Sequence, residues 1–103
     1  MQLEEFWLEG IRNWAEQNDN VREVWLFGSR AKDSAREDSD VDLMLVLMPP
    51  RKKHDWAFGN YMVLKSKWNA ELEAIVGRHV SLELKPSLDP PPSQLLWNRD
   101  ANQ

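Results

Sequence analysis

The chain has 103 residues, of which 42% are hydrophobic and 29% are charged, and its formal net charge is −4. This composition is typical of one small globular domain, and it excludes a disordered chain or a membrane-spanning chain. No apolar stretch reaches the roughly 20 residues that a transmembrane helix needs, and the acidic start lacks the features of a signal peptide, so we expect a cytoplasmic protein.

The absence of cysteine and the acidic charge narrow the chemistry further. Without cysteine, the protein has no disulfides, no thiolate metal sites and no cysteine nucleophile. Any metal ion must therefore be bound by oxygen or imidazole. The negative charge argues against an extended nucleic-acid surface, because phosphates usually require a basic face. A single nucleotide could still bind locally.

The chain begins with a predicted helix followed by a strand. Apolar residues recur at helical spacing from Leu3 to Trp14, and the polar segment Gln17-Asn18-Asp19-Asn20 ends the pattern. The apolar run Val24-Trp25-Leu26-Phe27 then predicts a buried strand that stops at Gly28.

A short helix and a central strand are expected next. We expect the helix over about residues 29–36 and a polar loop over residues 35–39. The apolar run over residues 41–47 predicts the second strand, which Pro49-Pro50 halts because proline cannot continue a ladder of backbone hydrogen bonds.

The longest helix is predicted in the second half of the chain. Apolar positions step by three or four residues from Asp55 to Val76, and Gly77 suits the C-terminal cap. Residues 80–84 alternate apolar and polar side chains, which predicts a third strand with one covered face. From about residue 86 we expect an irregular, proline-rich tail that ends in a single helical turn over residues 94–97. The sequence thus predicts one domain, residues 1–103, with an α/β fold of three strands and three main helices in the order αβαβαβ.

The six tryptophans are expected mainly to fill the core. The same interpretation applies to the stripe of Trp56, Tyr61 and Trp68 in the longest helix. A three-stranded sheet nevertheless has two faces to cover and few helices to cover them. A partner protein or a second copy of the chain would cover the remainder.

Two aspartates lie at the start of the second strand. Residues two apart on a strand point to the same face with Cα atoms about 6.5–7 Å apart, so Asp40 and Asp42 can converge on one ion. Mg²⁺ prefers oxygen ligands and often takes only one or two protein carboxylates. An Asp-x-Asp pair is also common in solvated loops. Asp42, however, lies inside an apolar strand, where an unpaired carboxylate is costly, and this position favours metal binding.

The Gly28-Ser29 pair supplies a candidate phosphate site. Glycine at the end of a strand lets the backbone turn sharply and approach a ligand closely. Backbone amides at a helix N-terminus and the Ser29 hydroxyl can bind phosphate oxygens, and Arg30 can reach a polyphosphate as a charged fork. An ordinary helix cap is the alternative for the pair alone.

Together the two segments resemble a known motif. Residues 26–31 and 39–43, with the spacing Gly-Ser-x10-Asp-x-Asp, are similar to the nucleotidyltransferase motif of the DNA polymerase beta superfamily. In length and layout the chain resembles the minimal nucleotidyltransferases, small prokaryotic proteins that consist of little but this catalytic domain. The resemblance extends from the first helix to about Leu88. It implies a mixed sheet and Mg²⁺-dependent transfer of a nucleoside monophosphate from a nucleoside triphosphate such as ATP.

The resemblance also implies roles for individual residues. Gly28 and Ser29 would hold the triphosphate, and Asp40 and Asp42 would bind one or two Mg²⁺ ions. Many members of the family work beside an all-helical HEPN partner, in several cases as the antitoxin that adenylylates a partner toxin. We therefore expect a HEPN-type partner or a homo-oligomer to supply the surface that a chain of this size lacks.

The sequence departs from the family pattern at the third catalytic carboxylate. Alignment with the family places Ser81 where an aspartate is expected, and a serine cannot bind Mg²⁺ as an anion or take a proton at neutral pH. Glu83, two residues on and on the same face, is the candidate substitute, and it could equally be a surface charge.

Three functions therefore stay open. The chain could transfer AMP to a protein or small-molecule hydroxyl, bind a nucleotide with weak turnover, or act as an antitoxin that modifies or covers a helical partner.

Overall fold

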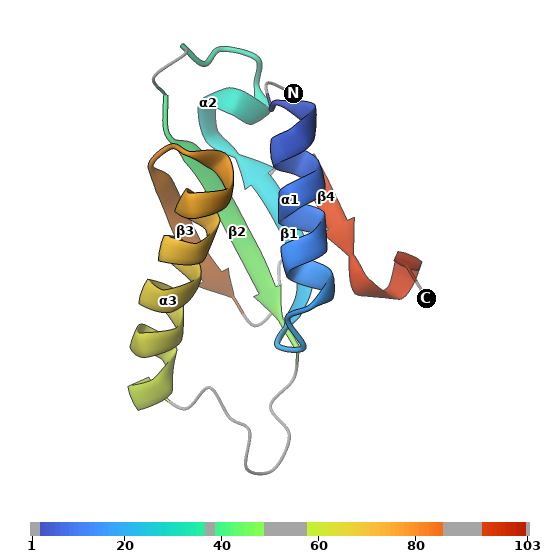
Figure 1. Cartoon of the computed structure of the whole chain (residues 1–103), viewed down its shortest axis with the longest axis vertical. Helices are drawn as coiled ribbons and strands as arrows, with labels where there is room; N and C mark the ends of the chain where they lie inside the picture. The colour runs from blue at the N-terminus through green and yellow to red at the C-terminus, as the bar shows by residue number, and fades with distance from the viewer. Residues whose placement is uncertain (1–2, 37–38, 49–57, 86–93, 103) are drawn as a thin grey trace.

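The structure, a computed structural model, describes residues 3–36, 39–48, 58–85 and 94–102. It forms a four-stranded sheet in the order β3-β2-β1-β4, with both long helices on one face (Figure 1). In chain order the elements are α1 (Glu5–Glu16), β1 (Val21–Phe27), α2 (Gly28–Ala31), β2 (Val41–Leu47), α3 (Phe58–Val76), β3 (Val80–Lys85), β4 (Gln94–Asn98) and the 3-10 helix η1 (Arg99–Asn102).

The sheet is mixed, and β2 is its central parallel strand. β2 pairs in parallel with β3 and antiparallel with β1, which also pairs antiparallel with β4. The predicted α/β fold with a mixed sheet is confirmed. The bounds of β2 agree with the run predicted over residues 41–47.

The core lies between this sheet and the two long helices. Alternate residues of β2 and β3 face the helices, because successive side chains on a strand point to opposite faces. Val41 and Leu43 are fully buried in this core, so the residue between them, Asp42, belongs to the opposite face. The buried core comprises Trp7, Ile11, Ala15, Val21, Val24, Leu26, Val41, Leu43, Leu45, Leu47, Trp68, Leu72, Val76, Val80, Leu82, Leu84, Leu96 and Trp97.

Helix α3 confirms the cap that the sequence predicts. Gly77 adopts a positive φ of 67°, and its N–H donates to the carbonyl oxygen of Glu73 at 2.8 Å. Trp68 is buried in the core, as expected. Trp56 and the side chain of Tyr61 lie outside the described part of the structure. None of the described helices is both long enough and apolar enough to cross a membrane.

The C-terminal segment corrects one prediction. Residues 94–97 were expected as a helical turn in an irregular tail, but they form strand β4. Trp97 pairs with Val24 on the edge of β1 that β2 leaves open. Backbone groups on that edge need partners, and periodicity alone cannot assign so short an apolar run. The sheet therefore has four strands where the sequence predicted three.

Arg99 joins this C-terminal segment to the rest of the molecule. Its Nε donates to the carbonyl oxygen of Val21 at 2.9 Å, and its Nη2 donates to those of Ala15 and Asn18 at 3.1 and 2.7 Å. The guanidinium also lies 4.9 Å from the centroid of the Trp97 ring. The planar guanidinium of Arg99 therefore satisfies backbone carbonyl groups at the end of α1 and at the start of β1 together.

We expect the Arg99→Lys variant to lose about 2 kcal/mol in the free energy of unfolding, because one ammonium cannot reach three carbonyls and leaves partly buried acceptors unpaired. Urea denaturation at neutral pH measures this loss. Arg22→Lys is the matched control, because Arg22 pairs with Asp100 only at the surface, at 3.5 Å. Its expected change is below about 0.5 kcal/mol. Equal losses in the two variants would contradict the role given to Arg99.

Candidate functional site

The residues of the sequence motif come together at one end of the sheet, where β1 ends and β2 and β3 begin (Figure 1). Antiparallel pairing places Phe27, the last residue of β1, opposite Asp42. Parallel pairing places Ser81 of β3 beside the same aspartate. Gly28 directly follows Phe27, so the turn, Asp42 and the start of β3 form one corner of the molecule.

Gly28 is in direct contact with Asp42. Its φ of 73° lies in the left-handed region, which residues with a side chain rarely adopt. A Cβ atom at Gly28 would overlap the Oδ2 atom of Asp42 and would lie 3.0 Å from its Cγ atom. The carboxylate therefore packs against the backbone of the turn, and a larger residue would displace one of them.

Asp42 is half-buried, and its surroundings disfavour its negative charge. Burial raises the pKa of the Asp42 carboxyl above its ordinary value of 3.8, and the carboxylate of Asp40 raises it further. Arg30 and His79 have smaller effects in the opposite direction. The corner thus holds two carboxylates that repel each other at neutral pH, an arrangement that a bound cation would stabilise.

Helix α2 is a single turn, Gly28–Ala31, and it is shorter than the helix predicted over residues 29–36. It ends because Asp33 adopts a φ of 58°. In addition, the N–H and the Oγ of Ser34 both donate to the carbonyl oxygen of Ser29, at 2.9 and 3.3 Å. Four residues carry little helix dipole, so an anion bound here would depend on the N–H groups of the turn and on the Ser29 hydroxyl.

Arg30 points into the protein and is only 6% exposed. Its Nε and Nη2 atoms donate to the carbonyl oxygen of Ser39 at 3.2 and 2.8 Å. Its guanidinium lies 5.4 Å from the centroid of the Trp7 ring. Because Ser39 directly precedes Asp40, Arg30 contacts the segment that carries a predicted metal ligand. The sequence had placed it as a fork directed at the polyphosphate.

His79 belongs to the same corner, although the motif does not include it. Its Nδ1 atom lies 3.2 Å from Oδ2 of Asp40, and its carbonyl oxygen accepts the N–H of Val41 at 2.9 Å. Its Nε2 atom lies 3.9 Å from Oε2 of Glu73, which accepts the N–H of Val80 at 2.9 Å. The parallel register of β2 and β3 was the available signal, because residues that precede two paired strands become neighbours.

Strand β3 brings no third carboxylate to Asp42. Ser81 is its partner, whereas Glu83 pairs with Met44, two residues further along the strand, and is exposed. Among the described residues, no group of three or more His, Cys, Asp or Glu side chains is placed to hold a metal ion. The acidic pair of this corner therefore consists of Asp40 and Asp42, without Glu83 beside them.

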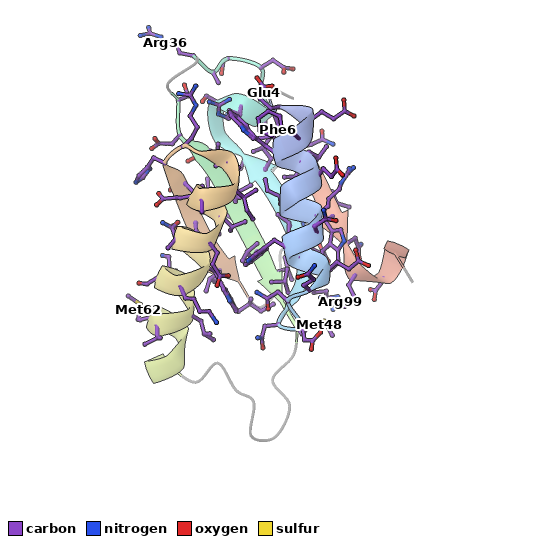
Figure 2. All side chains as sticks on the ribbon, in the orientation of Figure 1. Glu4, Phe6, Arg36, Met48, Met62 and Arg99 are labelled. Atoms are coloured by element: carbon purple, nitrogen blue, oxygen red, sulfur yellow. The ribbon has the colours of Figure 1, made fainter. Side chains whose placement is uncertain are left out.

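Figure 2 shows all placed side chains on the ribbon, with Arg36 beyond the end of the sheet that carries this corner. Arg36 is exposed, while its backbone N–H donates to the Oγ of Ser39 at 2.8 Å. Lys32, just after α2, is also exposed. Lys32 and Arg36 are thus two exposed cations in the segment between α2 and β2, in a protein whose net charge is negative.

Comparison with known proteins connects this corner to a family. The family model described as polymerase beta, nucleotidyltransferase matches residues 9–86, which include the whole motif. Among solved structures, a crystal structure of a toxin-antitoxin with AMP-PNP has a TM-score of 0.66 and 14% sequence identity, covering 92% of this chain and 76% of that chain. A proposed nucleotidyltransferase from Sulfolobus solfataricus has a TM-score of 0.49 and 19% identity, over 90% and 78% of the two chains. No curated protein matches the sequence. At 14% identity, the first likeness shows a shared fold.

Proposed function

This chain belongs to the polymerase beta nucleotidyltransferase family, and on that basis we propose that it transfers a nucleoside monophosphate from a nucleoside triphosphate to a hydroxyl group, with Mg²⁺ as cofactor. The proposed donor is ATP, so that AMP is transferred, and the acceptor is a hydroxyl of a protein or a small molecule. The observation that carries the proposal is the contact between the Gly28 turn and the Asp42 carboxylate, because it joins the two halves of the motif.

The acidic pair Asp40 and Asp42 fits a Mg²⁺ ion. Oxygen ligands in this number suit Mg²⁺, which takes its remaining ligands from water and substrate phosphates. Burial and mutual repulsion disfavour the Asp42 charge, and a divalent cation would offset both effects. When bound, Mg²⁺ supplies the positive charge that stabilises the transferred phosphoryl group and the departing pyrophosphate.

The turn after β1 is the proposed binding site for the triphosphate. Gly28 has no Cβ atom, so a phosphate group can approach its backbone closely. The Ser29 hydroxyl and the N–H groups of the turn donate hydrogen bonds to phosphate oxygens. The buried Arg30 adds its charge to this corner, as its effect on the Asp42 pKa indicates.

The acceptor is proposed to come with a partner. A HEPN-type helical protein is the first candidate and a second copy of this chain is the other. The shared fold with a toxin-antitoxin structure that contains AMP-PNP supports both a nucleotide and a partner protein. The second candidate function, a nucleotide-binding module that acts by covering a helical partner, is favoured by one observation, the serine at position 81 beside Asp42.

The position of a radioactive label in ATP distinguishes nucleotidyl transfer from nucleotide binding without transfer. We expect the protein, incubated with Mg²⁺ and the product of the adjacent gene, to transfer label from α-labelled ATP and none from γ-labelled ATP. The reason is that the γ-phosphate leaves within pyrophosphate. EDTA should abolish the transfer. Transfer of the γ-label would contradict nucleotidyl transfer, and a stable complex without any label would support the binding module.

The third acid determines how fast such an enzyme turns over. Glu83 was the proposed substitute, but it is exposed and lies beside Met44. Of the two roles considered for Glu83, we therefore favour that of a surface charge. A carboxylate at position 81 would lie beside Asp42, where the family pattern places its third acid.

We expect Ser81→Asp to raise the rate of transfer by at least about 10-fold, because a carboxylate there can serve as a general base for the acceptor hydroxyl. Glu83→Gln should change the rate by less than about threefold, since Glu83 is exposed and pairs with Met44, not with Asp42. Initial rates with α-labelled ATP at saturating Mg²⁺ measure both effects. A hundredfold loss in Glu83→Gln, without any gain in Ser81→Asp, would instead identify Glu83 as the working third acid.

A further inference from the structure

We propose that Arg30 and His79 are positioning residues that hold the segment Ser39-Asp40-Val41 from two sides and thereby fix the Asp40 carboxylate for metal binding. The proposal rests on the proposed function, because it assigns that carboxylate to a metal ion. In this proposal Arg30 holds the metal-binding segment and does not bind the triphosphate.

Arg30 holds the segment from the helical side of the sheet. Its guanidinium is buried, and two of its nitrogen atoms donate to one carbonyl oxygen, that of Ser39. Trp7 of α1, itself 8% exposed, lies against the same guanidinium and ties it to the core. The two N–H groups that are committed to this carbonyl oxygen are not available to a phosphate, so this edge of the guanidinium is directed at Ser39.

Ser39 is fixed through three of its polar groups. Besides the carbonyl bond to Arg30, its N–H donates to the carbonyl oxygen of Arg36 at 3.0 Å. Its Oγ accepts the N–H of Arg36 at 2.8 Å. The orientation of the peptide that leads into Asp40 is therefore determined before any ligand binds, and Arg30 supplies the part of this network that is anchored in the core.

His79 holds the segment from the side of β3. Its side chain pairs with Oδ2 of Asp40 at 3.2 Å, and its carbonyl accepts the N–H of Val41 at 2.9 Å. Glu73 fixes the start of β3 by accepting the N–H of Val80. Contacts of this kind, one shell out from a metal, orient the ligands, and their removal typically costs about 10- to 100-fold in metal affinity.

Three variants and one control test the proposal. Arg30→Lys keeps the charge and removes the fork, and His79→Ala removes the imidazole. His79→Asn is the conservative rescue, because its amide nitrogen can occupy the place of Nδ1. Arg22→Lys is the control, since Arg22 is an exposed arginine at the other end of β1.

The first readout is the affinity of the full chain for Mn²⁺ alone, measured by electron paramagnetic resonance. We expect Arg30→Lys and His79→Ala to weaken Mn²⁺ binding by about 10-fold, His79→Asn to recover it to within about threefold, and Arg22→Lys to leave it unchanged. The KM for ATP at saturating metal should change by less than about threefold in all four variants. A 10-fold or larger rise in this KM for Arg30→Lys, with unchanged Mn²⁺ affinity, would make Arg30 a triphosphate ligand and overturn the proposal.

The second readout needs neither metal nor nucleotide. In Arg30→Lys and His79→Ala, hydrogen exchange at the amides of Asp40 and Val41 should become about 10-fold faster relative to the core amide of Leu43. The ratio to the core amide separates local loosening from a general loss of stability. Unchanged exchange at both amides overturns the proposal. If the exchange behaves as expected but the wild-type protein binds no Mn²⁺, the proposed function fails, and the assignment of a metal to the held segment fails with it.

Discussion

Replacing Gly28 with alanine is expected to reduce transfer by at least about 100-fold, because a displacement of about 1 Å at a reacting centre can cost that much. The added methyl group would overlap the Oδ2 atom of Asp42, so the turn and the carboxylate cannot both keep their positions. Alanine must also adopt a φ of 73°, which costs about 1–3 kcal/mol for a residue with a side chain.

Gly77→Ala is the matched control for this prediction. Gly77 has a similar φ of 67°, but nothing lies within 4 Å of the place where its Cβ atom would be. We expect the control to lose about 1 kcal/mol of stability from backbone strain alone and to keep its transfer rate. Rates with α-labelled ATP and urea denaturation of both variants separate strain from overlap. Equal transfer rates in the two variants would show that the Gly28 contact does not matter for the reaction.

The parts of the fold that were predicted correctly depend on local chemistry. The bounds of β2 follow from an apolar run between Asp40 and Pro49-Pro50, and the end of α3 follows from the cap residue Gly77. Strand β4 could not be predicted in this way. Its five apolar or amide side chains suit either a helix or a strand, and the open edge of β1 decides between them. Such an edge is visible only after the sheet has formed.

In the candidate site, too, the contacts that depend on local sequence were predicted and those that depend on the tertiary fold were not. The spacing of the motif predicted that Gly28, Ser29, Asp40 and Asp42 belong together, and strand pairing brings Gly28 and Asp42 into contact. The direction of the Arg30 side chain was not predictable, because its burial depends on Trp7 of a helix far away in the sequence. A sequence motif thus predicts the residues that contact a ligand more readily than it predicts the residues that position those contacts.

Asp42→Asn is expected to abolish transfer, by at least about 1,000-fold, and at the same time to raise the melting temperature of the metal-free protein. The first effect follows because a neutral amide is a poor Mg²⁺ ligand and removes half of the proposed acidic pair. The second effect follows because burial and Asp40 disfavour the charge of Asp42, and asparagine keeps the shape of the side chain without this charge.

The pH dependence of this stabilisation has a defined sign. The folded-state pKa of Asp42 lies above its unfolded value of 3.8, so folding favours the protonated form. Below the unfolded pKa, the carboxyl is protonated in both states and costs the fold nothing. The penalty develops as the pH rises from the unfolded pKa to the folded pKa, and it is constant above the folded pKa. The melting temperature of the variant minus that of the wild type should therefore be largest above the folded pKa and shrink as the pH falls towards 3.8.

Thermal denaturation across this pH range, with and without Mg²⁺, tests the whole argument on one pair of proteins. Mg²⁺ should raise the melting temperature of the wild type, because it binds the folded state and relieves the repulsion between Asp40 and Asp42. It should not raise that of Asp42→Asn. Asp19→Asn, an exposed substitution in the turn between α1 and β1, should behave as the wild type in every measurement. A variant that is less stable than the wild type by the same amount at every pH would show that Asp42 supports the fold. In that case the negative charge of Asp42 would not destabilise the metal-free fold, and metal binding would have no such cost to offset.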